Sequence, residues 1–500
     1  MSQEKEIARM ELAIEDGKIE ASERNLKACA DIMIYQKELW KTMKPQLIEI
    51  DKNFVVEASQ LARKLMNEYS SARTEMGLAD AFAKEKTLDV KYCATFQSGW
   101  AYWGIHGWTE DEDNMVLSWI KGHIKSIANG EPKLEKSSVL NSVAKLLTID
   151  RSIVTRPEQW DSDKFLLGTP GGVINLKDGT ISKNNRGLLI SKKTSVEPSK
   201  DEDCPKWKKF LVDTTGADES MIAYLQRVAG YCLTGSIEEH ALFFAYGEGG
   251  NGKSVFIETL GGVMGNYWNT AQMDTFVAKN YENHTTELAG LRGSRMVTAV
   301  ETEEGRRWAE AKIKQMTGGD SIKARFMRQD DFTFRPEFKL LIAGNHAPSL
   351  SSVDKAIRRR FHILPFNQTP LKIDKSLVEK LKSEWPGILR WMINGAIMWS
   401  KVGLVRPEAV ENATNDYFEE QNTFLEWFEE TYKVSEDVED RVEKKEAYSS
   451  MASFYENYSL KPLNRTAFGK KIKGVFGIGD KKAGGVRYYT NIRKLEKGQV

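Results

Sequence analysis

Residues 241–254 read Ala-Leu-Phe-Phe-Ala-Tyr-Gly-Glu-Gly-Gly-Asn-Gly-Lys-Ser, an apolar run followed by a glycine-rich loop. From Gly247 onward the loop matches the phosphate-binding pattern G-x-x-x-x-G-K-[ST]. Its glycines allow successive backbone N–H groups to point at phosphate oxygens, Lys253 can reach the β and γ phosphates, and the Ser254 hydroxyl is placed to ligate Mg²⁺. The pattern predicts a nucleoside triphosphate site with ATP and Mg²⁺ as cofactors. The residues expected to bind the nucleotide are Gly247, Gly249, Gly250, Asn251, Gly252, Lys253 and Ser254.

The sequence around this loop supports that interpretation. Residues 241–246 have the apolar character of a buried strand, and residues 255–260 continue as a helix, so the required order of strand, loop and helix is present. A helix that starts at the loop adds its positive end to the site. The alternative is a glycine-rich surface turn, which would usually lack this order.

Composition and length indicate a large multidomain protein. The chain has 500 residues, of which 41% are hydrophobic, and this length suggests two to four domains. It contains no run of about 18 apolar residues, and its first residues lack the design of a secretory signal, so we expect a cytoplasmic protein without a membrane partner. The four cysteines are widely scattered and predict reduced, mostly structural thiols. The six histidines are also dispersed, so Mg²⁺ that arrives with nucleotide is the expected ion.

Charge is distributed unevenly along the chain. The net charge is only +1, but residues 461–500 contain eleven Lys or Arg and two Asp or Glu, whereas residues 408–446 are rich in acids. This pattern predicts a solvated connector followed by a module that binds a polyanion. The helix-like segment 468–473 places Lys470, Lys471 and Lys473 in that module, and we expect these lysines to contact DNA.

Two polar groups follow buried strands downstream of the loop. Residues 295–304 form an apolar strand that ends in carboxylates, the arrangement needed to hold Mg²⁺ through water and to polarise an attacking water. Glu301 is the first choice for the catalytic and metal-binding carboxylate and Glu303 the second; helix capping by these acids is the alternative. Residues 338–345 form another strand-like run that ends in Asn345, whose amide can sense the γ phosphate.

Two basic segments complete the candidate site. The arginines at 358–360 precede a predicted strand, and an arginine that reaches a neighbouring subunit's γ phosphate would neutralise transition-state charge. Arg360 and Arg359 are the candidates, against the alternative of a solvated basic cluster. Residues 321–334 alternate like a hairpin, and the cations on it either grip a phosphate backbone or belong to a plain edge hairpin. These cations are Lys323, Arg325 and Arg328.

Aromatic and turn-rich segments lie upstream of the loop. Residues 92–108 predict a β-hairpin in which Trp100, Trp103 and Trp108 fill a core rather than stack on bases. Residues 166–181 contain the Asp-Gly signal of a tight hairpin and predict scaffold. Residues 221–235 have helical apolar spacing and predict a helix beside the central sheet.

In this order the segments resemble superfamily 3 helicases of the phage and plasmid primase-helicase family, the branch that includes poxvirus-type replicative NTPases. The resemblance runs from about residue 77 to 494. Its most specific elements are residues 301–307, 314–320 and 323–326, Asn345-His and Arg359-Arg360. Residues 166–179 and 224–235 look like the helicase-associated N-terminal domain of that family.

The resemblance implies a hexameric ring of AAA+-like subunits that binds ATP between protomers and moves DNA through a central channel with 3′ to 5′ polarity. It implies that Glu301 lies in the acidic strand-end motif, that Asn345 is the sensor, and that Arg360, with Arg359 behind it, acts in trans. The hairpin from Lys323 to Phe334 corresponds to the channel hairpin. The chain departs from the family at Arg358, where an aromatic residue is frequent, and at Gly171, where Asn is frequent.

The expected fold class is multidomain α/β. Residues 1–75 form a helical leader, too short and too helical for a primase; residues 76–206 a mixed α+β helicase-associated domain; and residues 207–370 a P-loop, AAA+-like ATPase core. Residues 371–432 form a helical segment, and residues 433–500 a basic winged-helix-like DNA-binding domain.

The expected function is that of an ATP-dependent replicative DNA helicase of a phage, plasmid or mobile element, without primase activity. The expected partners are single-stranded and forked DNA, further copies of the chain, and a separate primase or other replication proteins. One alternative is a DNA-stimulated ATPase that acts as an origin-binding remodeller or loader without processive unwinding. A nucleotide-gated DNA-binding scaffold that hydrolyses ATP poorly is another, and it would require Glu301 or Arg360 to be misplaced.

Overall fold

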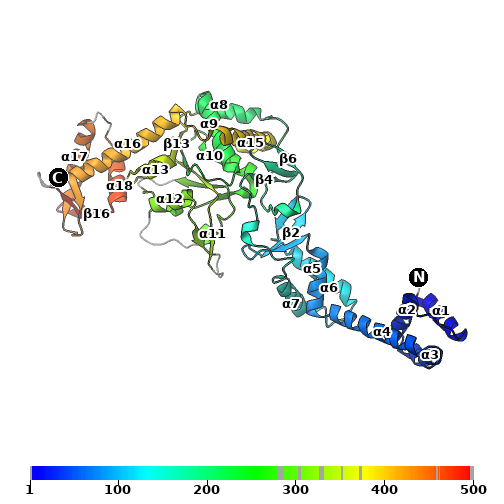
Figure 1. Ribbon diagram of the computed structural model, residues 1–500. Coiled ribbons are helices and arrows are strands. Elements are labelled where there is room, and N and C mark those ends of the chain that lie inside the picture. The colour runs from blue at the N-terminus through cyan, green and yellow to red at the C-terminus, as the bar shows by residue number, and fades with distance from the viewer. Residues whose placement is uncertain are drawn as a thin grey trace. The chain divides into compact units, whose positions relative to one another are not determined.

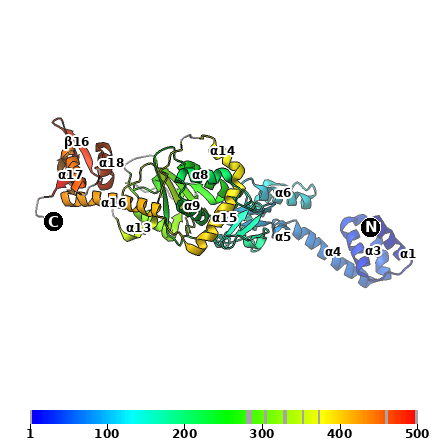
Figure 2. The ribbon, with the colours of Figure 1, turned by 90° about the horizontal axis from the view of Figure 1, so that it is seen from above.

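The structure is a computed structural model that describes residues 3–278, 286–301, 306–325, 331–350, 353–370, 374–457, 460 and 462–495. The chain divides into two compact units (Figures 1 and 2). The first comprises Met1–Gly104 and Thr109–Pro157, and the second comprises Ile105–Trp108 and Glu158–Val500. None of the helices within the described ranges is both long and apolar enough to cross a membrane.

The first unit begins with helices, which confirms the predicted helical character of this region. They are α1 (Gln3–Glu15), α2 (Glu23–Tyr35), α3 (Lys37–Ile50), α4 (Lys52–Ala72) and α5 (Glu75–Lys86). Side chains cap three of them: Ser22 accepts a hydrogen bond from the N–H of Asn25, Asp51 from the N–H groups of Asn53 and Phe54, and Thr74 from the N–H of Gly77. Apolar residues of α1 to α4 share one core.

A small sheet and two further helices follow. The sheet has the order β1-β2-β3, with β1 at Val90–Tyr92, β2 at Trp100–Gly104 and β3 at Gly107–Glu110. The helices are α6 (Met115–Ala128) and α7 (Ser137–Leu147). Trp100 and Trp108 are 6% and 1% exposed, which confirms that both fill a core, whereas Trp103 is half-buried.

A five-stranded parallel sheet forms the centre of the second unit. Its order is β13-β7-β12-β9-β8, and every neighbouring pair is parallel. The strands are β7 (Leu242–Tyr246), β8 (Trp268–Thr270), β9 (Met296–Glu301), β12 (Lys339–Gly344) and β13 (Phe361–Pro365). This parallel sheet confirms the α/β class.

Helices cover both faces of this sheet (Figure 1). Because side chains alternate along a strand, Phe243 of β7 packs into one core and Phe244 into the other. The first core includes residues of α9 (Glu219–Leu233), α10 (Lys253–Met264) and α15 (Trp385–Val402). The second includes residues of α12 (Glu310–Gly318), α13 (Lys355–Arg360) and α16 (Glu408–Thr431). The expected helix before the loop strand is therefore confirmed as α9.

Smaller elements surround this domain. A sheet of order β4-β5-β6 contains Leu166–Thr169, Gly172–Asn175 and Ile181–Ser182. Hairpins are therefore present, but the two-residue turn is at Pro170 and Gly171, between β4 and β5, whereas Asp178 and Gly179 lie in the longer connection from β5 to β6. The antiparallel pair of β10 (Ile322–Ala324) and β11 (Phe332–Phe334) confirms the second predicted hairpin. The remaining helices are α8 (Pro205–Thr215), α11 (Thr286–Ala289) and α14 (Leu377–Leu381).

The C-terminal elements pack around their own aromatic core, which includes Phe424, Trp427, Phe468 and Tyr489. The helices are α17 (Lys444–Asn457) and α18 (Arg465–Phe476). The strands are β14 (Tyr432–Val434), β15 (Arg441–Glu443), β16 (Gly479–Ala483), β17 (Val486–Thr490) and β18 (Ile492–Lys494), in sheets of order β15-β17-β16 and β14-β18. The predicted order, a basic helix followed by a glycine-containing hairpin, is confirmed.

Candidate nucleotide-binding site

The glycine-rich loop connects β7 to α10, and its geometry requires glycine at two positions. Gly252 has φ +91°, and a Cβ there would lie 2.6 Å from a methyl carbon of Thr214. A Cβ on Gly247 would lie 2.2 Å from the carbonyl oxygen of Phe366. Both positions therefore exclude any side chain, and the loop keeps its backbone close to the start of α10.

Lys253 lies inside this loop. Its Nζ donates hydrogen bonds to the carbonyl oxygens of Gly247 at 2.6 Å and Glu248 at 3.0 Å, and to Oδ1 of Asn251 at 2.9 Å. The residue is 8% exposed, and its burial lowers the pKa of the Lys253 ammonium below the usual lysine value. Asn251 also donates a hydrogen bond to the carbonyl oxygen of Phe366, so the segment after β13 holds the loop in place.

The start of α10 has the properties of a phosphate site. The N-cap is Gly252, which offers no side chain to cap the first N–H groups, and the helix has 12 residues. Ser254 is exposed in its first turn. A Cβ on Gly249 would meet nothing within 4 Å, so space is open beside the loop. Backbone donors, a lysine and a hydroxyl therefore fit a triphosphate with its Mg²⁺.

Glu301 and Asn345 lie at the same edge of the sheet as the loop. Gly344 at the end of β12 pairs with Tyr246 on one side and with Glu301 on the other. Two strand spacings, about 10 Å, therefore separate the last residue of β7 from Glu301. Glu301 is 5% exposed, and the next residue after Gly344 is the exposed Asn345. Parallel strands thus bring together groups that the sequence predicted separately; Glu303 lies outside the described residues.

The arginine cluster lies at the opposite end of the parallel strands, where β13 and β7 begin. Phe361, the first residue of β13, pairs with Leu242 at the start of β7, whereas Pro365 pairs with Tyr246 beside the loop. Four residues of extended strand, about 13 Å, therefore separate the start of β13 from the level of the loop. Within one chain, Arg359 and Arg360 are not at the phosphate loop.

The arginines at this edge differ in exposure. Arg360 is 7% exposed; its Nε donates to Oγ1 of Thr317 at 3.1 Å, and its Nη1 donates to the carbonyl oxygen of Ala356 at 2.7 Å. Burial, with a contribution from neighbouring Arg359, lowers the pKa of the Arg360 guanidinium. Arg358 donates to Oδ1 of Asn415 at 3.0 Å. Arg359 is exposed, so it is the better placed of the two candidates to reach outside its own chain.

The β10–β11 hairpin presents fewer free cations than the sequence suggested. Lys323 forms an ion pair with Asp331 at 2.8 Å, and this hydrogen bond lowers the pKa of the Asp331 carboxyl. Arg325 is exposed next to β10, and Arg328 lies outside the described residues.

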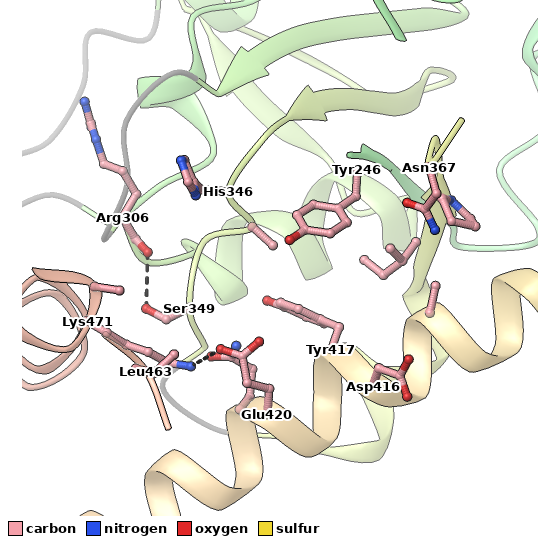
Figure 3. Close-up of a pocket in the computed structure, with 16 residues that line it drawn as sticks. Tyr246, Arg306, His346, Ser349, Asn367, Asp416, Tyr417, Glu420, Leu463 and Lys471 are labelled. Atoms are coloured by element: carbon pink, nitrogen blue, oxygen red, sulfur yellow. Dashed lines mark hydrogen bonds and ion pairs between the residues drawn. The ribbon is translucent and has the colours of Figure 1, made fainter. Parts of the chain in front are cut away.

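A cavity of about 460 Å³ lies beside the ends of β7 and β13 (Figure 3). Its walls include Tyr246 from the sheet, Tyr417 and Glu420 from α16, and Lys471 from α18. Lys471 donates to Glu420 at 2.9 Å and lies 4.9 Å from the ring centre of Phe424. The Lys471 ammonium, which the sequence predicted to contact DNA, therefore pairs with an acid of its own chain. The C-terminal module also accepts a hydrogen bond, from Nη1 of Arg307 to the carbonyl oxygen of Val475 at 3.1 Å.

The sequence did not predict that α18 lies beside the end of the sheet that carries the phosphate loop. The residues that meet there come from the ends of distant strands and from two helices, so no contiguous motif marks them. The one local signal was the set of aromatic residues among acids along residues 417–428 of α16. Tyr417 and Phe418 pack into a core of the central sheet, and Phe424, Trp427 and Phe428 pack into the C-terminal core.

Two family models match the chain. Residues 79–216 match the D5_N family, described as D5 N terminal like, and residues 245–360 match DUF5906, a family of unknown function. A protein of Acanthamoeba polyphaga mimivirus that is named a helicase is 24% identical over 329 residues, which are 61% of this chain and 34% of that protein. A protein of Invertebrate iridescent virus 3, also named a helicase, is 25% identical over 248 residues, 47% of this chain and 26% of that protein. Together these matches support the resemblance to the phage and viral primase-helicase family.

The resemblance found in the sequence is thus confirmed at the level of phage and viral primase-helicases. The chain spans about a third and about a quarter of the lengths of these two viral relatives. The apo structure of the NrS-1 C-terminal region aligns with 83% of this chain and 98% of that chain, with a TM-score of 0.45 and 11% identity. The second family match, residues 245–360, contains the loop, Glu301, Asn345 and the arginines.

Proposed function

We propose that this primase-helicase family chain is an ATP-dependent replicative DNA helicase of superfamily 3. The observation that supports this most directly is the common sheet edge of Lys253, Glu301 and Asn345, because triphosphate hydrolysis needs a phosphate cradle, a carboxylate and a polar sensor together. The proposed helicase is a hexameric AAA+-like ring that moves on DNA with 3′ to 5′ polarity in the cytoplasm.

Each group at this edge has a role in the proposed hydrolysis. Lys253 and the first backbone N–H groups of α10 bind the β and γ phosphates. Ser254, and Glu301 through water, would hold Mg²⁺, which would supply neutralisation of charge on the phosphate oxygens. Glu301 orients the attacking water and accepts its proton, with Glu303 as the second candidate. Asn345 donates a hydrogen bond to the γ phosphate or to the water beside it.

The proposed ring follows from the position of the arginines. Since Arg359 and Arg360 lie at the edge away from the loop of their own chain, they can reach a γ phosphate only on another copy. A contact between the arginine edge of one copy and the loop edge of the next is heterologous, and such contacts generate rings when the rotation closes. We propose that Arg359 makes this contact and that Arg360, bound to Thr317, positions it.

DNA is the proposed polyanion partner of two regions. The β10–β11 hairpin contributes Lys323 and Arg325 to a channel, together with Arg328. The C-terminal module is proposed to be winged-helix-like and contributes Lys470 and Lys473. For Lys471, whose ammonium pairs with Glu420, we propose the positioning of α18 against α16.

The test is ATP turnover with and without single-stranded DNA, together with strand displacement on forked duplexes that have either a 3′ or a 5′ loading tail. A helicase of the proposed polarity shows DNA-stimulated turnover and displaces strands only from the 3′-tailed fork. DNA-stimulated turnover without displacement would favour the remodeller or loader. Turnover that is indifferent to DNA would contradict both.

A further inference from the structure

The hairpin of β16 and β17 contains two cations that face each other across the strands. Lys482 and Arg487 are direct register partners in this antiparallel pair, and both are exposed. Like charges directly opposite each other destabilise a strand pair. In the part of the chain that the structure describes, neither side chain has an ion-pair partner.

Three nearby lysines are paired with carboxylates. Asp480 accepts hydrogen bonds from Lys444 at 2.6 Å and from Lys473 at 3.3 Å. Lys481, the neighbour of Lys482, pairs with Glu439 at 3.1 Å. Lys444, Lys473 and Lys481 are therefore compensated by acids, whereas the opposed pair at the end of the hairpin has no ion-pair partner among the described residues.

Strand alternation places this pair on the side of α18. Residues two apart on a strand share a face, so Lys482 lies on the face of Asp480, and Arg487 lies on the face of Tyr489. Tyr489 is buried and packs edge-on against Phe468 of α18. Lys481 lies on the other face, because it is one residue removed from Lys482. The opposed pair therefore extends the face of the sheet that packs on α18.

The turn of the hairpin consists of two glycines and has no side chains. Gly484 and Gly485 have φ +56° and +85°, and a Cβ at either position would meet nothing within 4 Å. Two successive residues with positive φ are typical of a tight two-residue turn. A nucleic-acid backbone can therefore approach this end of the hairpin without meeting a side chain at the turn.

We propose that Lys482 and Arg487 bind phosphates of duplex DNA at the end of the β16–β17 hairpin. This inference rests on the proposed function for the choice of DNA as the polyanion. Phosphate binding gives the opposed charges a counterion that the described part of the chain does not supply. The site differs from the α18 lysines predicted from sequence, of which Lys471 and Lys473 pair with acids.

The experiment measures binding of the full chain, without nucleotide, to a fluorescein-labelled duplex by anisotropy at several salt concentrations. The double variant Lys482→Gln/Arg487→Gln should bind about tenfold more weakly at low salt, and the slope of log K against log salt should fall by about 2, since each phosphate contact contributes about 0.9. Lys481→Gln is the matched control, one residue away on the opposite face, and should keep the wild-type slope. An unlabelled single strand of equal length, used as a competitor, tests the preference for duplex.

A double variant with the wild-type affinity and slope would overturn the inference, as would an equal loss from Lys481→Gln or stronger competition by the single strand than by duplex. Arg487→Glu provides a folding control, since it replaces repulsion with an ion pair: its Tm should rise while duplex binding weakens, and unchanged binding would contradict the site. ATP turnover separates the two claims. DNA-stimulated turnover with no effect of the double variant refutes only this site, whereas a reduced slope without any DNA-stimulated turnover refutes only the helicase.

Discussion

Phe361 pairs in parallel register with Leu242, at the edge of the central sheet opposite the phosphate loop. Because Arg360 immediately precedes Phe361, the arginine cluster is fixed at that edge by the strand pairing itself. An arginine there cannot reach the loop of its own chain, which lies about 13 Å further along the strands. In the proposed ring, the two ends of the strands would therefore provide the two halves of a site that is completed between copies.

Arg359→Ala should remove the exposed guanidinium and reduce ATP turnover by about 100-fold or more, since an arginine supplied in trans contributes at least that much in related phosphoryl transfer. When the variant is titrated into wild-type subunits, turnover should fall more steeply than by dilution of active subunits. Arg360→Ala should also lower the Tm, because it breaks the hydrogen bonds to Thr317 and Ala356, whereas Arg359→Ala should not. Inhibition by Arg359→Ala that only follows dilution would argue against action in trans.

Glu301→Gln should separate nucleotide binding from hydrolysis. The amide keeps the shape of the buried side chain but cannot accept a proton, so turnover should fall by about 100-fold to 10,000-fold while ATP affinity changes little. Calorimetric titration and steady-state turnover measure the two quantities. Glu258→Gln, an exposed change on α10, is the control and should behave as the wild type. Normal turnover by Glu301→Gln would exclude it as the catalytic carboxylate.

Lys471→Ala should destabilise the chain rather than weaken DNA binding. The lysine side chain is 11% exposed and pairs with Glu420, which is 49% exposed. The substitution removes this ion pair and the contact of the ammonium with the Phe424 ring. We expect the free energy of unfolding to fall by about 1 kcal/mol, because a partly exposed ion pair and a cation–π contact each contribute at most about that much. A double-mutant cycle with Glu420→Gln measures the pair, and duplex affinity should stay within about twofold. A clear loss of DNA affinity at unchanged stability would instead place Lys471 at the DNA surface.

Contiguous motifs explain what the sequence could predict. The loop from Gly247 to Ser254 needs only local glycines and a following helix, and Glu301 and Asn345 each follow a recognisable apolar strand. Since parallel strands end at one side of a sheet, the sequence alone predicts that the loop, Glu301 and Asn345 lie close together.

The rest depends on register and helical phase, which a single sequence does not reveal. The opposite position of the arginines follows from the pairing of β13 with β7, more than a hundred residues apart. Arg359 and Arg360 differ by one residue, and this step of about 100° on α13 separates an exposed guanidinium from a buried one. The pairing of Lys471 with Glu420, 51 residues away, could not be predicted either, because it also depends on helical phase and on how distant helices pack.

The most direct test of the central claim is ATP-dependent strand displacement on a 3′-tailed fork by Lys253→Ala. Lys253 lies within the loop and is proposed to bind the β and γ phosphates, so its removal should abolish both displacement and ATP turnover while the chain still binds duplex through its C-terminal module. Lys401→Ala, an exposed lysine at the end of α15, is the matched control and should unwind normally. Displacement by Lys253→Ala at the wild-type rate would contradict the proposal that this site powers unwinding.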